Sequence, residues 1–162
     1  MTALGESTGE PSVGKPLRGH ETILLVEDDE AVRQLCREEL HKLGYRIIEA
    51  RNGIEACLVA TPHMGKLQLL LTDIVMPGMS GTELARHLRV INPELQILFI
   101  SGYEDDIGIG AGDTQVAYLE KPFTTEILIG TVRYLLDQAS KGQRQQGPLP
   151  EGVGQSQTIS PS

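Results

Sequence analysis

Short apolar runs alternate with longer amphipathic stretches along most of this chain. Apolar runs of this length between helical stretches are typical of buried parallel strands. The expected strands are residues 22–27, 46–50, 67–72, 96–100 and 116–120. The expected helices are residues 30–43, 53–61, 82–91 and 125–139. This alternation predicts an α/β fold: a doubly wound, five-stranded parallel sheet with right-handed crossovers.

The pattern weakens between the fourth and fifth expected strands. An acidic triplet, residues 104–106, is suited to start a helix, but Gly108, Gly110 and Gly112 follow it. Each glycine costs about 1 kcal/mol relative to alanine inside a helix. We therefore expect a short, frayed helix or a loop in this segment.

Both ends of the chain lack apolar periodicity. Residues 1–19 are rich in Gly, Ser, Thr, Pro and Glu, and residues 141–162 are rich in Gln, Gly, Pro and Ser. Such compositions are typical of flexible segments. The sequence predicts one folded domain, residues 20–140, with a disordered tail at each end.

Composition and charge narrow the classes of function. The chain is 40% hydrophobic with a net charge of −8, which fits a globular protein and argues against a nucleic-acid partner. No run approaches the roughly 20 apolar residues of a membrane helix, and the start lacks the apolar core of a signal peptide. The cysteines and histidines lack metal-ligand spacing. We expect a cytoplasmic protein without membrane contact.

Chemically active side chains follow four of the five expected strands. Glu27 and Asp28 end the first strand, Asp73 follows the third, Ser101 the fourth and Lys121 the fifth. Each has an ordinary explanation by itself, such as a turn, a helix start or a surface lysine. In an open α/β sheet, however, ligands bind at the carboxyl ends of the strands. If these strands are neighbours, the side chains share one crevice.

Carboxylates crowded in this way require a cation. Two unit charges about 4 Å apart repel by roughly 4 kcal/mol at an effective dielectric constant near 20. Lys121 offsets part of that repulsion, and a hard cation such as Mg²⁺ relieves more of it. An aspartate in such a site can act as the nucleophile toward a phosphoryl group. The cation and Lys121 would neutralise the phosphoryl oxygens, and Ser101 would hydrogen-bond one of them.

Four motifs in order carry a resemblance to a known family. They are Leu-Leu-Val-Glu-Asp-Asp at 24–29, Leu-Thr-Asp-Ile-Val-Met-Pro-Gly-Met-Ser-Gly at 71–81, Ile-Ser-Gly-Tyr at 100–103 and Tyr-Leu-Glu-Lys-Pro-Phe at 118–123. Over residues 21–140 the chain resembles a response-regulator receiver domain of two-component systems. The resemblance implies a flavodoxin-like fold with strand order 2-1-3-4-5.

The resemblance also implies roles for the acidic residues. Asp73 matches the phosphoacceptor, and Glu27 and Asp28 match the acidic pair of the family. The implied Mg²⁺ ligands are the carboxylates of Asp28 and Asp73 and the backbone carbonyl of Val75. The Val75 side chain is apolar and unable to orient an attacking water, so we expect a long-lived phosphoryl group.

The remaining motif residues match the family's switch and phosphoryl contacts. Ser101 corresponds to the switch hydroxyl, and Tyr118, three residues before Lys121, corresponds to the switch aromatic. Lys121 matches the lysine of the family pattern, and a cis peptide bond is implied before Pro122. The glycine-rich segment 108–112 departs from the family at the surface that commonly forms dimers. We therefore expect a monomer or a weak dimer.

Together these features predict a phosphoacceptor signalling module. Its partner would be a histidine kinase or a histidine phosphotransfer protein, whose phosphohistidine supplies the phosphoryl group. The chain would assist its own phosphorylation and dephosphorylation without being an enzyme. Residues after 140 are too few and too polar for a DNA-binding or catalytic output domain. Residues 18–32 also resemble receivers fused behind histidine kinases, so a stand-alone protein and a detached hybrid-kinase receiver both stay open.

Three other classes fit the sequence less well. A flavodoxin-type electron carrier needs a Ser/Thr/Gly-rich phosphate loop after the first strand and aromatics around the flavin, but this loop is acidic and the chain lacks tryptophan. A Mg²⁺-dependent phosphatase is disfavoured because no DxDx[TV] pattern follows a strand. A receiver-like adaptor that is never phosphorylated is disfavoured by the complete set of site residues.

Overall fold

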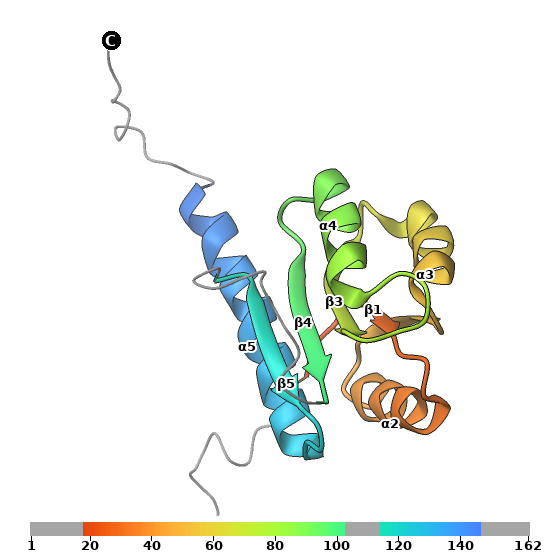
Figure 1. Cartoon of the computed structure of the whole chain (residues 1–162). Helices are drawn as coiled ribbons and strands as arrows, with labels where there is room; N and C mark the ends of the chain where they lie inside the picture. Colours follow the sequence, from red (N-terminus) through yellow and green to blue (C-terminus); the bar gives the residue numbers. More distant parts are fainter. Residues whose placement is uncertain (1–17, 103–113, 147–162) are drawn as a thin grey trace, which may run out of the picture.

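The computed structural model describes residues 18–102 and 114–146, which form an α/β domain around a parallel sheet (Figure 1). All neighbouring strands run parallel, in the order β2-β1-β3-β4-β5. The strands are β1 (Thr22–Val26), β2 (Arg46–Ala50), β3 (Leu67–Asp73), β4 (Gln96–Ser101) and β5 (Val116–Glu120). The predicted fold class and strand order are confirmed.

Helices cover both faces of the sheet (Figure 1). The helices are α2 (Glu30–His41), α3 (Gly53–Ala60), α4 (Gly81–Ile91) and α5 (Thr125–Gln146). In β1, Ile23 and Leu25 pack with residues of α2 and α5, whereas Leu24 and Val26 pack with residues of α3 and α4. Because side chains alternate between two buried faces, the strand is apolar without interruption.

Most predicted element boundaries agree with the observed ones, and all the others except the end of α5 differ by one or two residues. Helix α2 ends at His41, two residues early, and Gly44 follows with a φ of 106°, a left-handed conformation that favours glycine. Helix α3 ends at Ala60, and Pro62 lies in the 3-10 helix η2 (Thr61–His63). Strands β3 and β4 each extend one residue beyond the prediction, through Asp73 and Ser101.

The prediction for the end of the last helix was wrong. Helix α5 continues to Gln146, so residues 141–146 are helical although the sequence placed them in the C-terminal tail. Gln and Arg have good helix propensity, and Pro148 is the first proline after this helix begins. Polarity alone therefore does not end a helix. The rest of the predicted tails, and Gly108, Gly110 and Gly112, lie outside the described residues.

A buried ion pair ties α5 to the start of β1. Arg133 Nη2 lies 2.7 Å from Glu21 Oε2, and Nη1 donates to the second carboxylate oxygen at 3.2 Å and to the Tyr45 hydroxyl at 3.0 Å. Burial alone would raise the pKa of Glu21, but the hydrogen bonds and charge of Arg133, with backbone amides, lower it. Arg133 and Glu21 thus form a bidentate ion pair that is largely shielded from solvent.

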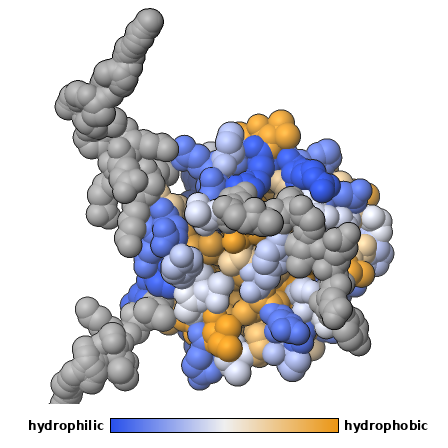
Figure 2. Space-filling view, turned by 60° about the vertical axis from the view of Figure 1, so that its left-hand side comes forward, coloured by the Kyte–Doolittle hydropathy of each residue, from blue (hydrophilic) through white to orange (hydrophobic). Residues whose placement is uncertain are grey.

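The outer side of α5 leaves some apolar surface exposed. The view in Figure 2 shows apolar residues between hydrophilic ones on the side of the molecule where α5 and β5 lie. Tyr134 and Ile127 are exposed, whereas Leu136 of the same helix is buried. Among the described residues, none of the helices is both long and apolar enough to span a membrane.

Candidate functional site

Strand register brings the expected site residues to one edge of the sheet. Val26 of β1 pairs with Thr72 of β3, so Glu27 and Asp73 follow at the same level. Asp73 in turn pairs with Ile100 of β4, which directly precedes Ser101. Because the strands are parallel, their carboxyl ends meet at this edge.

Three carboxylates gather there. Glu27, Asp28 and Asp73 each offer an oxygen atom within 4.8 Å of the other two. Glu27 is fully buried and Asp73 is 8% exposed, whereas Asp28 is open to solvent. The three carboxylates therefore lie close together, as the sequence predicted, and solvent reaches them at Asp28.

Lys121 supplies the positive charge at the site. Its Nζ lies 3.4 Å from Asp73 Oδ2 and 3.5 Å from Glu27 Oε1. Burial would lower the pKa of Lys121, but the charges of Glu27 and Asp73 outweigh burial and raise it. Lys121 is therefore charged and neutralises part of the cluster. The peptide bond from Lys121 to Pro122 is cis, as the resemblance implied.

Glu27 is the most perturbed acid of the cluster. Burial, reinforced by the negative charge of Asp73, raises its pKa to about 7, against the opposing effects of the Asp29 amide and Lys121. Its Oε2 accepts a hydrogen bond from the Asp29 N–H at 3.0 Å, but its buried Oε1 accepts none within the described part of the chain. Lys121 Nζ is 3.5 Å from this oxygen, so the contact is a loose ion pair that compensates its charge only in part.

The donor set fits a hard divalent cation. All three acidic residues offer oxygen, the ligand atom that Mg²⁺ requires, and one carboxylate oxygen is buried without a hydrogen bond. Lys121 leaves the three carboxylates with an excess of negative charge. The residues present therefore suit Mg²⁺ better than a soft metal, which would require thiolate or imidazole.

Ser101 lies on β4, next to the strand of Asp73, and Tyr118 lies on β5, one strand further from it. Ser101 is buried, and its backbone carbonyl accepts a hydrogen bond from the Lys121 N–H at 2.8 Å. Tyr118 is partly exposed, and its ring stacks on Phe99, with centroids 5.4 Å apart and the planes inclined by 19°. The switch roles of Ser101 and Tyr118 stay predictions.

The loop after Asp73 is held by a close backbone approach. The Gly81 N–H donates to the Ile74 carbonyl at 2.8 Å, and a Cβ at Gly81 would overlap the Asp73 carbonyl. Ser80 caps α4 in a capping box with Glu83, which fixes the start of this helix. The side chain of Val75, within the loop, is 64% exposed.

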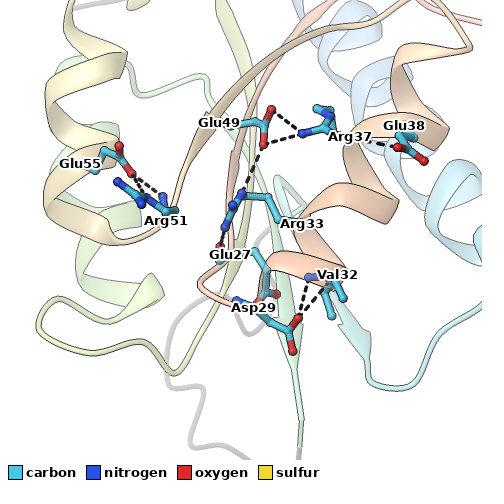
Figure 3. Close-up of polar contacts among 10 residues, drawn as sticks. Glu27, Asp29, Val32, Arg33, Arg37, Glu38, Glu49, Arg51 and Glu55 are labelled. Carbon is cyan, nitrogen blue, oxygen red and sulfur yellow. Dashed lines mark hydrogen bonds and ion pairs between the residues drawn. The ribbon is translucent and has the colours of Figure 1, made fainter.

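The sequence reasoning missed one residue that contacts the site. Arg33 of α2 donates from Nη1 to the backbone carbonyl of Glu27 at 2.9 Å (Figure 3). The only signal in the sequence is its place one turn after Asp29, the residue that caps α2. An arginine at that position is ordinary on a helix surface, and its direction depends on packing.

Known proteins resemble this chain in both sequence and fold. The chain matches the family described as "Response regulator receiver domain" over residues 23–133. It is 38% identical over 120 residues to the response regulator receiver protein CpdR of Brucella abortus (strain 2308), covering 70% of this chain and 95% of CpdR. It is 37% identical over 123 residues to the sensor kinase CckA of the same organism, covering 75% of this chain.

A solved receiver-domain structure has the same fold as this chain. The crystal structure of the receiver domain from the hybrid histidine kinase CckA superposes with a TM-score of 0.62 at 35% identity, covering 71% of this chain and 98% of that domain. The chain spans 13% of the CckA sensor kinase and 56% of each of two transcriptional regulators that it also matches. It thus corresponds to one domain of these longer proteins. The chain belongs to the response regulator receiver family, the phosphoacceptor signalling domains of two-component systems.

Proposed function

We propose that this chain accepts a phosphoryl group on Asp73 from the phosphohistidine of a histidine kinase or a histidine phosphotransfer protein. The observation that carries the proposal is the arrangement around Asp73. Its carboxylate lies within 4.8 Å of oxygens of Glu27 and Asp28 and 3.4 Å from Lys121 Nζ. Receiver domains are signalling modules rather than enzymes, so the output would be a change of protein contacts.

The transfer replaces one bond to phosphorus with another. A carboxylate oxygen of Asp73 forms the new P–O bond while the P–N bond to the donor imidazole breaks. The bonding electrons stay on the imidazole nitrogen, which takes up a proton from solvent. Lys121, already 3.4 Å from Asp73, would pair with a phosphoryl oxygen, and the Ser101 hydroxyl would donate to another.

Magnesium fits the same arrangement. Asp28, Asp73 and the backbone carbonyl of Val75 would hold Mg²⁺, with Glu27 close by. When bound, Mg²⁺ supplies neutralising charge for the phosphoryl oxygens. The exposure of Asp28 leaves the cluster accessible from solvent.

Phosphorylation would then change the charge at the edge of the sheet. The phosphoryl group replaces a single carboxylate charge with about −1.5 to −2 and adds acceptor oxygens. Ser101 on the neighbouring strand β4 and Tyr118 on β5, one strand further, would shift between two arrangements. The relatives include a receiver protein, CpdR, and a sensor kinase, CckA. Both a stand-alone chain and a receiver detached from a kinase fit this role.

The proposal predicts a phosphoryl adduct on the wild-type protein that depends on Mg²⁺. Incubation with acetyl phosphate and Mg²⁺ should add the mass of one phosphoryl group, because the carboxylate then attacks with its neighbours neutralised. EDTA in place of Mg²⁺ should suppress the adduct. Intact mass spectrometry measures both, and hydroxylamine, which cleaves acyl phosphates but not phosphoesters, identifies the bond. An adduct that persists in EDTA or resists hydroxylamine would contradict the proposal.

The exposed Val75 side chain predicts slow loss of the phosphoryl group. An apolar side chain offers no hydrogen bond to position an attacking water, whereas an amide at the same place does. We expect Val75→Asn to release phosphate about tenfold faster, less than the roughly 10²–10⁴-fold that a positioned general acid or base contributes, because an amide orients the water without taking its proton. Release is followed as free phosphate after removal of acetyl phosphate. Val90→Asn, at another exposed valine, is the control and should match the wild type. Equal rates for Val75→Asn and wild type would refute this.

A further inference from the structure

We infer that Arg33 is a positioning residue for the acidic pair, holding Glu27 and Asp28 in the geometry that binds Mg²⁺. The inference rests on the proposed function, because the pair is taken to belong to the metal and phosphoryl site. Arg33 itself contacts the backbone of the pair and is not a ligand.

Arg33 makes two hydrogen bonds to the turn between β1 and α2, one from its side chain and one from its backbone. Its guanidinium Nη1 donates to the Glu27 carbonyl at 2.9 Å, and its backbone N–H donates to the Asp29 carbonyl, also at 2.9 Å. In Figure 3 the Arg33 side chain reaches back from α2 toward the end of β1. The Glu27 carbonyl belongs to the peptide plane that joins Glu27 to Asp28. Holding that plane restricts the backbone rotations on either side of it, and these rotations set the directions in which both side chains leave the backbone.

The other end of the guanidinium is anchored on a different strand. Arg33 Nε lies 3.2 Å from Glu49 Oε1, on β2, and Arg37 Nη1 lies 3.1 Å from Glu49 Oε2 (Figure 3). The Arg33 side chain is 12% exposed, so its contacts are shielded from water. A planar guanidinium donates in two directions at once, which the single ammonium of lysine does with less defined geometry. Glu49 therefore holds Arg33 in the rotamer that contacts Glu27.

Two roles for Arg33 lead to opposite expectations. As a mere positive charge near the acidic cluster, Arg33 would repel Mg²⁺, and its removal would tighten metal binding. As a positioning residue, its removal would free the peptide plane and weaken metal binding. Groups that orient metal ligands typically contribute 10–100-fold to metal affinity. The sign of the change thus separates the two roles.

The experiment compares Arg33→Met with Arg37→Met in the full chain. Both variants lose one cation and one partner of Glu49, but Arg37 makes no hydrogen bond to residues 27–29 among the residues that the structure describes. Calorimetric titration with Mg²⁺ should show about 10-fold weaker binding or worse for Arg33→Met, and binding within about twofold of wild type for Arg37→Met. Glu49→Gln should weaken binding in the same direction by a smaller factor. Urea unfolding in EDTA records stability separately.

The outcomes distinguish this inference from the proposed function. Unchanged or tighter Mg²⁺ binding by folded Arg33→Met overturns the inference alone, and so does equal weakening by both arginine variants. Absence of Mg²⁺ binding by the wild type overturns the proposed metal site and the inference with it. If Arg33→Met does not fold, Arg33→Lys replaces it: weakened binding supports the positioning role, and wild-type binding overturns it.

Discussion

Replacing Asp73 with asparagine is expected to abolish the phosphoryl adduct formed with acetyl phosphate and Mg²⁺. The amide has nearly the shape of the carboxylate but is not a nucleophile toward phosphorus at neutral pH. The substitution also removes the negative charge of Asp73, which Lys121 balances in the wild type at 3.4 Å. Covalent catalysis requires the nucleophile itself, so the loss should be complete rather than partial. Intact mass spectrometry of the wild type and the variant measures it directly.

Asp29→Asn is the matched control for this experiment. Asp29 is an exposed aspartate close to the site, and its side chain caps α2 by accepting from the Ala31 and Val32 amides. Asparagine is also a good cap, so the helix should persist. We expect the wild-type adduct on Asp29→Asn. A normal adduct on Asp73→Asn, or loss on both variants, would remove Asp73 from the phosphoacceptor role.

Replacing Arg133 with methionine is expected to destabilise the fold far more than replacing the exposed Arg37 in the same way. Its guanidinium is 16% exposed and donates to Glu21, Tyr45 and the Arg18 carbonyl. Removing it leaves the Glu21 carboxylate, 6% exposed, buried without its cation. Breaking a buried pair from one side costs about 3–5 kcal/mol. The free energy of unfolding from urea denaturation at neutral pH should fall by that amount.

The cost of Arg133→Met should depend on pH. The folded-state pKa of Glu21 lies below its usual value of 4.5, so the pair stabilises the wild type above pH 4.5. This stability is lost as the pH falls through the lower, folded-state pKa. The difference between wild type and variant should therefore be largest near neutral pH and shrink below pH 4.5. A difference that grows on acidification would contradict the assignment.

Arg37→Met tests whether the loss of any ion-paired arginine would lower the free energy of unfolding as much as the loss of Arg133. Its side chain is 37% exposed and pairs with Glu49 and Glu38 at the surface. Exposed pairs contribute about 0–1 kcal/mol, so the variant should lose at most that much. A loss equal to that of Arg133→Met would show that burial of the Glu21–Arg133 pair has no special effect.

The strands themselves and the edge that carries the site follow from local patterns, whereas the strand order was implied only by the resemblance to the family. Apolar runs mark strands because strands covered on both faces contain few polar residues. Polar residues that end those runs, such as Asp73 and Lys121, gather because parallel strands end together. The order of the motifs then indicated the family, which sequence and structure comparisons confirm. These features depend on residues close together in the chain.

Other features depend on packing between distant elements. Nothing in the sequence distinguishes Glu27, fully buried, from its exposed neighbour Asp28, because burial depends on the strands and helices packed around each side chain. The contacts of Arg133 with Glu21 and of Arg33 with Glu49 join residues far apart in the chain. Arginines on helix surfaces are common, and only the assembled fold determines which of them are buried against a carboxylate or a backbone carbonyl.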